Sequence, residues 1–360
     1  VPPHRVLAIN RGERARAIRV RIPFDEAAAL EEGVRKLIAA EHPQRDLLAG
    51  WLEDAMSRLI VPSLEREIRR ELTERAELHA VSVFARNLRN LLLQPPVRGR
   101  RVAAVDPGYK SGCKIAVLDE TGNLVESHVV FVVGNADRRR QGRAWLAEAI
   151  RRHRIAAIAI GNGTASREVE SLIADMLDHE LKDSGVAYVM VNEAGASVYS
   201  TSPVGREELP TTDPTIRSAI SIGRRLLDPL SELVKISAEN LGVGLYQHDV
   251  KAKHLRESLD AVVESCVNFV GVDANTSSPA LLRYVSGLNQ LSARRFVEYR
   301  SEHGPFSDRS QFSNVPGFGE QTFVQAAGFL KIPDGVHPFD ATWIHPESYP
   351  IAEKVVDSLG

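Results

Sequence analysis

The middle of the chain carries three β-rich segments in succession, with no helical segment between them. They are residues 101–106, 112–119 and 124–133, and they are separated by turns at Gly108 and Gly122. We therefore expect a meander of three antiparallel strands. The pattern then alternates, in the order helix 137–153, strand 155–161, helix 166–183, strand 187–193 and helix 215–227. A Rossmann sheet is excluded, because each of its strands is followed by a helix.

Helical segments flank this α/β region on both sides. Residues 24–93 and 254–270 have apolar side chains at helical spacing. Within the first range we expect separate helical stretches over 25–41, 46–60 and 62–93, the last of which starts at Pro62. Residues 1–22 differ from them, and we expect two short β-leaning segments separated by a turn at Gly12. Three antiparallel strands followed by helix–strand alternation are the order of an RNase H-like fold. The predicted fold class is therefore a multidomain protein with α/β and all-α parts.

Composition sets limits on this protein. The chain has 360 residues, of which 43% are hydrophobic, and its 45 Lys and Arg against 47 Asp and Glu exclude a globally basic DNA coat. Two cysteines, Cys113 and Cys266, are too few for a disulfide scaffold or a cysteine zinc cluster. We expect a cytoplasmic monomer without a membrane partner, since no apolar run approaches the roughly 18 residues of a span. The chain starts at Val1 without a methionine, which we interpret as a fragment.

Two hairpin-like units near the C-terminus are the strongest local signal for binding. They centre on Ser286–Asn289 and Val315–Gly319, about 30 residues apart, and are interpreted as a tandem repeat. In helix-hairpin-helix units a glycine turn points backbone amides at a phosphate and reads no bases. We expect Asn289 to replace the second glycine in a left-handed conformation. The alternative is a pair of helical turns that pack only against each other. The predicted nucleic-acid contacts are Gly287, Asn289, Gly317, Gly319, Arg294, Arg295 and Lys331.

Three carboxylates form a candidate catalytic and metal site. Asp106 ends the first strand before Pro107–Gly108, Glu193 ends the strand 187–193, and Asp213 precedes the helix 215–227. Scattered carboxylates at one sheet edge are what a Mg²⁺ or Mn²⁺ site requires. Taken alone, Asp106 is more often a turn residue, and Asp213 is better explained as a helix N-cap before proline. Without an active acidic site, no cofactor is expected.

Two further features admit both a functional and a structural interpretation. The Gly161–Ser166 loop precedes a helix and could cradle a phosphate, although such loops are common. Asn162 lies where many nucleases of this fold place a glutamate, and an amide is a poor Mg²⁺ ligand. The arginine-rich helix 137–153 could follow a phosphate backbone or be a solvated face.

Several enzyme classes have no support in the sequence. It contains no GxxxxGK[ST] phosphate loop, no GxGxxG after a first strand and no GxSxG elbow. The histidines are scattered, without zinc spacing. ATP-driven and serine-hydrolase functions are therefore not predicted.

Longer motifs, taken in order, resemble one family over nearly the whole chain. They are HRVLAINRGE, VFARNLRNLLLQPP, VDPGYKSGCKIAVLDETG, IGNGTASRE, VNEAGASVYS, SAISIGRRLLDPLSELVKI, GVGLYQHDV, SLDAVVESCVNFVGVDANTSSPALLRYVSGLN and VPGFGEQTFVQAAGFLKI. This pattern resembles the Tex family of bacterial transcription accessory proteins. Motifs of this length and order are far more specific than any single feature above.

The resemblance implies a domain organisation. It comprises a helical region (1–97), a YqgF-type RNase H-like domain (98–230), a helix-hairpin-helix domain (231–335) and a tail (336–360) leading to an OB-type RNA-binding domain. The family also has a longer N-terminal helical part. By this resemblance, the acidic set of YqgF-type nucleases falls on Asp106, Glu193 and Asp213. The Tex branch is regarded as nucleic-acid binding and not nucleolytic.

The first hypothesis is thus a scaffold of the transcription machinery that binds RNA or DNA without sequence preference, with RNA polymerase or ribosome-associated machinery as partner. The alternatives are a Mg²⁺- or Mn²⁺-dependent nuclease using the three carboxylates, and a protein-interaction platform with an inert RNase H-like domain.

Overall fold

The computed structural model describes residues 1–359 and divides into two compact units. Unit 1 comprises Val1–Phe84 and Gly244–Leu255, and unit 2 comprises Ala85–Val243 and Arg256–Gly360. Within the described residues, no helix combines the length and apolar character that crossing a membrane requires.

Unit 1 begins with a helix where the sequence predicts β-leaning segments. That prediction is wrong: α1 (Pro3–Arg14) runs through Gly12, and its Pro3 at the first helical position has the backbone angle that a helix requires. Val6 and Leu7 are buried, and the Asn10 amide donates to the Thr73 hydroxyl at 2.9 Å. Tertiary packing of this face outweighs the β-propensity of the segment.

The remaining helices of unit 1 follow the predicted ranges, with one difference at Pro62. They are α2 (Glu26–Leu37), α3 (Arg45–Ala55), the π-helix η1 (Met56–Ile60) and α4 (Val61–Leu92), which belongs to unit 1 as far as Phe84. A 3₁₀ turn, η3 (Gln247–Asp249), also lies in this unit. Two separate helices are expected here, but the helical backbone continues through η1. The Val61 amide bonds to the Met56 carbonyl. This wider turn accommodates the proline ring, which would clash in a regular α-helix.

Unit 2 contains the predicted five-stranded sheet. Its strands are β1 (Val102–Asp106), β2 (Cys113–Leu118), β3 (Leu124–Val130), β4 (Ala157–Gly161) and β5 (Ala187–Val191), in the spatial order β3-β2-β1-β4-β5. The pairs β1–β2 and β2–β3 are antiparallel, and β1–β4 and β4–β5 are parallel. The RNase H-like order predicted from the sequence is confirmed.

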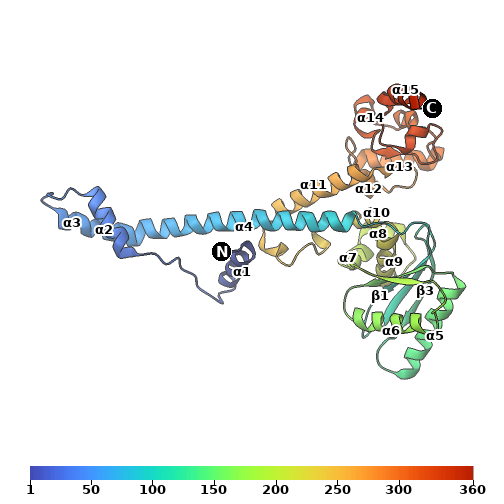
Figure 1. Cartoon of the computed structure of the whole chain (residues 1–360), viewed down its shortest axis with the longest axis horizontal. Helices are drawn as coiled ribbons and strands as arrows, with labels where there is room; N and C mark the ends of the chain where they lie inside the picture. Colours follow the sequence, from blue (N-terminus) through green and yellow to red (C-terminus); the bar gives the residue numbers. More distant parts are fainter. Residues whose placement is uncertain (360) are drawn as a thin grey trace. The chain divides into compact units, whose positions relative to one another are not determined.

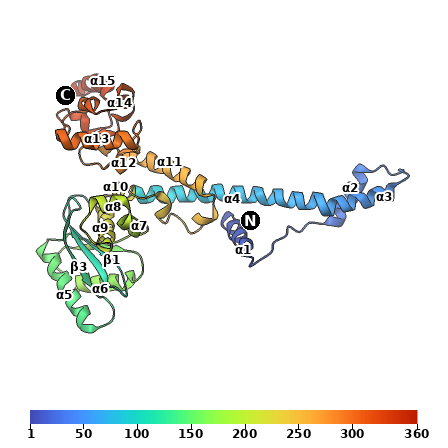
Figure 2. The same ribbon diagram turned by 180° about the vertical axis from the view of Figure 1, so that it is seen from behind.

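Helices cover both faces of this sheet (Figures 1 and 2). Alternate residues of β1 point to opposite sides. Ala103 and Val105 pack with α5 (Ala136–Arg152) and α6 (Ser166–Asp178), whereas Val102 and Ala104 pack with α9 (Pro214–Leu227). The short helices α7 (Ala196–Thr201), α8 (Pro203–Glu208) and α10 (Pro229–Leu233) were not predicted from the sequence.

Gly223 sets how closely α9 approaches the sheet. A Cβ at this position would lie 2.5 Å from Leu118 Cδ1 and 2.8 Å from Ala104 Cβ. Gly223→Ala is therefore expected to lower the free energy of unfolding by about 1–3 kcal/mol, measured by urea denaturation. Gly50→Ala is the matched control, since open space surrounds this glycine in α3 and a gain of up to about 1 kcal/mol is expected. Equal stability of the Gly223→Ala protein and the wild type would contradict this packing.

The C-terminal part of unit 2 is helical, as predicted. After η2 (Ala238–Asn240), α11 (Ala252–Val270) leads to α12 (Pro279–Leu282), α13 (Gln290–His303), the 3₁₀ helix η4 (Arg309–Asn314) and α14 (Glu320–Ala326). The strands β6 (Val272–Asp273) and β7 (Leu330–Lys331) form a parallel pair. Beyond them lie η5 (Pro338–Ala341), η6 (Pro346–Ser348) and α15 (Tyr349–Leu359). The core of this part is a cluster of phenylalanine rings: Phe296, Phe306, Phe312 and Phe318.

Candidate nucleic-acid interface

The two hairpins are structurally equivalent. Gly287 and Gly317 have φ of 83° and 84°, in the left-handed region that favours glycine. In both turns the amide that follows this glycine donates to a valine carbonyl at 2.9 Å, from Leu288 to Val285 and from Phe318 to Val315. The tandem repeat predicted from the sequence is confirmed.

Each hairpin turn packs against the helix that follows the other turn: the first turn against α14, and the second turn against α13. A Cβ at Gly287 would lie 2.7 Å from Gln325 Cβ in α14, and one at Gly317 would lie 2.7 Å from Arg295 Nη1 in α13. Arg295 and Gln325 are also separated by the repeat length of about 30 residues. The repeats are thus reciprocal, except that only the second turn has a guanidinium beside it.

The helix starts after the two turns differ in how their amides are satisfied. Asn289 caps α13 with its side chain, which accepts from the amides of Leu291 at 2.9 Å and Ser292 at 3.0 Å. Its φ of −131° is extended, so the expected left-handed conformation is wrong. Gly319 has no side chain to cap α14 and is also extended, with φ of −75°. The first-turn amides of α14 are therefore available to a phosphate oxygen, whereas Asn289 already bonds two of those of α13.

Only some of the basic residues predicted as nucleic-acid contacts have exposed side chains that can reach a phosphate. Arg294 and Arg295 are exposed. Lys331, by contrast, donates to the Val270 carbonyl at 3.0 Å and lies over the Trp343 ring. Two other arginines near the hairpins are internal: Arg300 donates to the carbonyls of Ala274 and Ser277, and Arg309 is 1% exposed.

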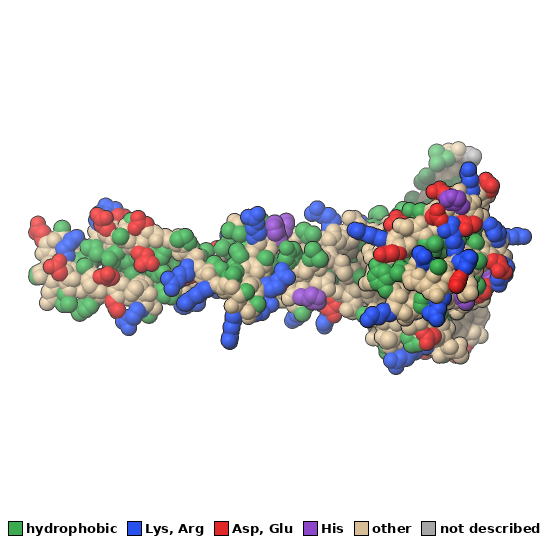
Figure 3. Space-filling model, turned by 90° about the horizontal axis from the view of Figure 1, so that it is seen from below, with side chains coloured by type: hydrophobic (Ala, Val, Ile, Leu, Met, Phe, Trp, Pro, Cys, Tyr) green, Lys and Arg blue, Asp and Glu red, His purple; other side chains and the backbone are tan. Residues whose placement is uncertain are grey.

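The arginine-rich helix α5 is largely neutralised by neighbouring carboxylates. Arg143 donates to Glu180 at 2.6 Å, and Arg152 to Glu148 at 2.8 Å. Figure 3 shows Lys and Arg side chains interspersed with Asp and Glu on the face that it draws. Of the two interpretations of this helix, the solvated face has the better support.

Two of the three predicted carboxylates lie together at the ends of β1 and β5. Burial raises the pKa of Asp106, against a hydrogen bond from Ser218 that lowers it. Burial, followed by the negative charge of Asp106, raises the pKa of Glu193. Neither Ser218 nor the nearby Arg225 had a sequence signal for this role.

Asp213 does not join this pair. Its carboxylate caps α9 by accepting from the Thr215 amide at 2.8 Å, which is the N-cap role that the sequence offers as the alternative. Hydrogen bonds from Thr215 lower the pKa of Asp213. Across residues 1–359, no three or more His, Cys, Asp or Glu side chains are grouped to hold a metal ion. The three-carboxylate arrangement expected for Mg²⁺ or Mn²⁺ is therefore not formed.

Glu193 occupies the loop that the sequence suggests as a phosphate cradle. A Cβ at Gly163 would lie 1.6 Å from Glu193 Oε1, and the Gly163 amide donates to this carboxylate. The Asn162 side chain accepts from the Glu193 amide at 3.1 Å and so positions it. A phosphate would meet the carboxylate in this place, so the structure disfavours the cradle.

The Asp106–Glu193 pair predicts a pH dependence of stability. Because the pKa of both groups is raised on folding, the folded state retains protons that the unfolded state releases. Their contribution is present below pH of about 4 and is lost as pH rises through the folded pKa values. Glu193→Gln should therefore unfold at a higher urea concentration than the wild type at pH 7, with the difference shrinking toward pH 4. Asp213→Asn is the control of opposite sign, because folding lowers the pKa of Asp213. A difference that does not change with pH would contradict the assignment.

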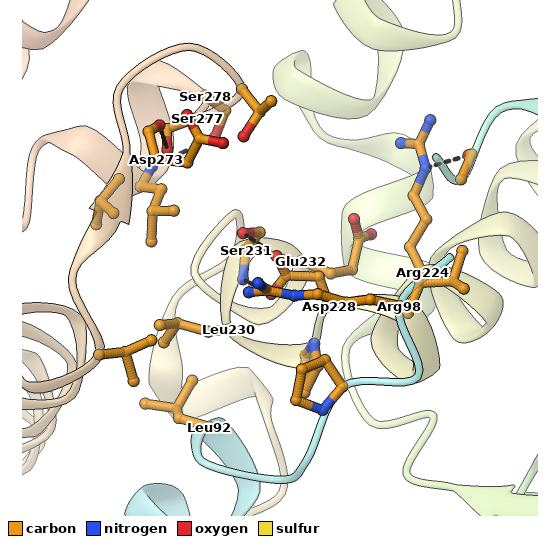
Figure 4. A pocket seen from close by; sticks show the side chains of 18 of the residues that line it. Leu92, Arg98, Arg224, Asp228, Leu230, Ser231, Glu232, Asp273, Ser277 and Ser278 are labelled. Atoms are coloured by element: carbon orange, nitrogen blue, oxygen red, sulfur yellow. Dashed lines mark hydrogen bonds between the residues drawn. The ribbon is translucent and has the colours of Figure 1, made fainter. Parts of the chain in front are cut away.

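A cavity of about 850 Å³ in unit 2 is lined in part by residues of the segment 92–98, at the end of α4 and before β1. Figure 4 shows Arg98, Asp228 and Ser231 on one side, and Asp273, Ser277 and Ser278 on the other. Its polar groups are mostly bonded within the protein: Asp228 accepts from Ser231 Oγ at 2.8 Å, and Ser277 Oγ donates to the Asp273 carbonyl. The cavity therefore lacks the convergent free groups of a small-molecule site.

Comparison with known proteins agrees with these features. Residues 100–227 match the Tex protein YqgF-like domain, residues 267–331 the helix-hairpin-helix motif, and residues 337–360, the expected tail, a helix-hairpin-helix domain. The chain is 46% identical to the uncharacterized protein YdcI of Bacillus subtilis, with 100% of the chain and 50% of the relative covered. It is 44% identical to the protein tex of Bordetella pertussis (99% and 47%) and 42% to the transcriptional accessory protein Tex of Neisseria gonorrhoeae (100% and 48%). The chain thus spans about half the length of the curated relatives it matches.

Proposed function

Because this chain belongs to the Tex family, we propose that it binds RNA or DNA along the phosphate backbone, without sequence preference, as a scaffold of the transcription machinery. The observation that carries this proposal is the second hairpin. Its left-handed Gly317, its uncapped Gly319 and the adjacent Arg295 combine free amides with a positive charge. Amides and guanidinium groups are both donors suited to phosphate oxygens.

The first hairpin contributes mainly to the fold. Asn289 already accepts hydrogen bonds from two amides of α13. The side chain beside Gly287 is the neutral Gln325, whereas the one beside Gly317 is Arg295. One strong and one weak phosphate site support modest affinity from this module alone. Binding through phosphates carries no base information, which supports sequence independence.

The cellular setting is part of the same proposal. The name of the Neisseria gonorrhoeae relative supports a role in transcription, with RNA polymerase or ribosome-associated machinery as the partner. Both cysteines are free and buried, and the proposed location is the cytoplasm.

The nuclease alternative has less support. The YqgF-like domain has the RNase H-like sheet, and Asp106 and Glu193 lie at its expected edge. Two carboxylates without the third do not fit the Mg²⁺ or Mn²⁺ set that such nucleases require.

The test is fluorescence anisotropy with labelled single-stranded and duplex oligonucleotides over a salt series, with Mn²⁺ present and the products run on a gel. We expect log K to fall linearly with log salt concentration and the oligonucleotide to stay intact. Absence of binding at low salt would overturn the proposal. Cleavage that is lost in Asp106→Ala would favour the nuclease instead.

A further inference from the structure

Trp343 is an exposed tryptophan on a loop that the protein interior holds in place. The loop lies between η5 and η6, within the C-terminal segment that Figure 1 draws in red, and Trp343 is 60% exposed. The buried Arg309 guanidinium donates to the Thr342 carbonyl at 2.6 Å and to the Ile344 carbonyl at 2.7 Å. The peptide groups on both sides of the indole are thus fixed before any ligand arrives, which lowers the entropic cost of binding.

One face of the indole is covered by a cation. Lys331 Nζ lies 3.1 Å from the ring centroid and is held there by its hydrogen bond to the Val270 carbonyl. Burial and the positive charges of Arg309 and Arg98 lower the pKa of Lys331. The indole therefore carries a cation on one face and leaves the rest of the ring exposed, an arrangement that suits a ligand with both an aromatic face and negative charge.

The position of Trp343 relative to the second hairpin is set by α14. The Trp343 loop contacts the C-terminal end of this helix, where His345 Nε2 is 3.0 Å from the Val324 carbonyl oxygen. The hairpin lies at the N-terminal end, and the 7 residues of α14 correspond to about 10 Å at a rise of about 1.5 Å per residue. A single strand a few nucleotides long is therefore long enough to contact both the hairpin and Trp343.

We propose that Trp343 is a stacking platform for one unpaired base of a single-stranded nucleic acid whose phosphates the second hairpin holds. This inference rests on the proposed function and adds to it a residue that contacts a base. Stacking on an aromatic ring tolerates any base, which agrees with binding that does not read sequence. Bases inside a duplex have no free face, so they gain nothing from the platform.

The test compares Trp343→Ala with wild type by anisotropy on three probes: a thymidine oligonucleotide, an abasic oligonucleotide of equal length, and a blunt duplex. We expect roughly 5- to 150-fold weaker binding of the thymidine probe and unchanged binding of the other two. Trp51→Ala is the matched control, because Trp51 in α3 is equally exposed, at 61%. Trp343→Phe, which keeps an aromatic face, should retain most of the affinity.

The outcomes separate the two proposals. If the wild type binds none of the probes, the proposed function fails, and the platform fails with it. If the wild type binds and Trp343→Ala binds each of the three probes as tightly as the wild type does, the platform alone is overturned. The indole is then left as a contact for a protein partner. Equal losses on the thymidine and abasic probes would also overturn it, since stacking needs a base.

Discussion

Arg309→Met is expected to lower the free energy of unfolding of the C-terminal helical module by about 3–5 kcal/mol. Arg309 is 1% exposed and donates to the carbonyls of Leu330, Thr342 and Ile344 at 2.8, 2.6 and 2.7 Å. Its removal leaves these carbonyls without donors and leaves the fully buried Asp340 without a nearby cation. Circular dichroism during urea denaturation measures the loss.

Two further variants identify the origin of this loss. Arg294→Met removes an exposed arginine of the same module and should change stability by no more than about 0.5 kcal/mol. Arg309→Met combined with Asp340→Leu should recover part of the loss, because the uncompensated buried carboxylate is then also absent. An Arg309→Met protein as stable as the wild type would show that these hydrogen bonds contribute nothing net.

Arg295→Glu is expected to weaken oligonucleotide binding roughly 10- to 100-fold at low salt, because it places a negative charge where the proposed phosphate lies. The Arg295 guanidinium lies against Gly317, and the side chain is otherwise exposed, so the fold should be unaffected. The salt dependence should also become shallower by about one unit of slope. Anisotropy titrations at several salt concentrations measure both effects.

The control for net charge is Arg66→Glu, which changes the net charge of the protein by the same amount as Arg295→Glu but at an exposed position of α4 in unit 1. Its affinity should remain close to that of the wild type. Gln325→Arg places beside the first hairpin a cation like the one that Arg295 supplies to the second. A several-fold gain in oligonucleotide affinity is expected if the missing charge is what limits binding at the first hairpin. Equal losses in Arg295→Glu and Arg66→Glu would show a general charge effect and contradict a local phosphate site.

The sequence predicts the sheet and the hairpins well because both depend on local signals. Short apolar runs and glycine turns define β1 to β5, and the left-handed turns require Gly287 and Gly317. The failures lie where tertiary packing or an irregular backbone outweighs the local signal. The β-leaning start folds as α1 because Val6 and Leu7 are buried by distant residues, and the break expected at Pro62 is absorbed by the π-helix η1.

The roles of individual charged residues were not predictable in the same way. Arg294, Arg295, Arg309 and Lys331 look alike as basic residues beside a hairpin, yet the first two are exposed and the others are engaged inside the module. Likewise, three carboxylates have suitable positions in the sequence, but only Asp106 and Glu193 interact.

The sequence by itself determined the order of strands and helices, the tandem hairpins and the chemistry of their glycine turns, since each depends on the backbone preferences of adjacent residues. Only the tertiary structure decided which amides stay uncapped, which arginine reaches a turn, that Glu193 fills the Gly163 loop, and that Arg309 and Lys331 hold Trp343 at the surface. These outcomes depend on distances between side chains far apart in the chain, and such distances are set by packing.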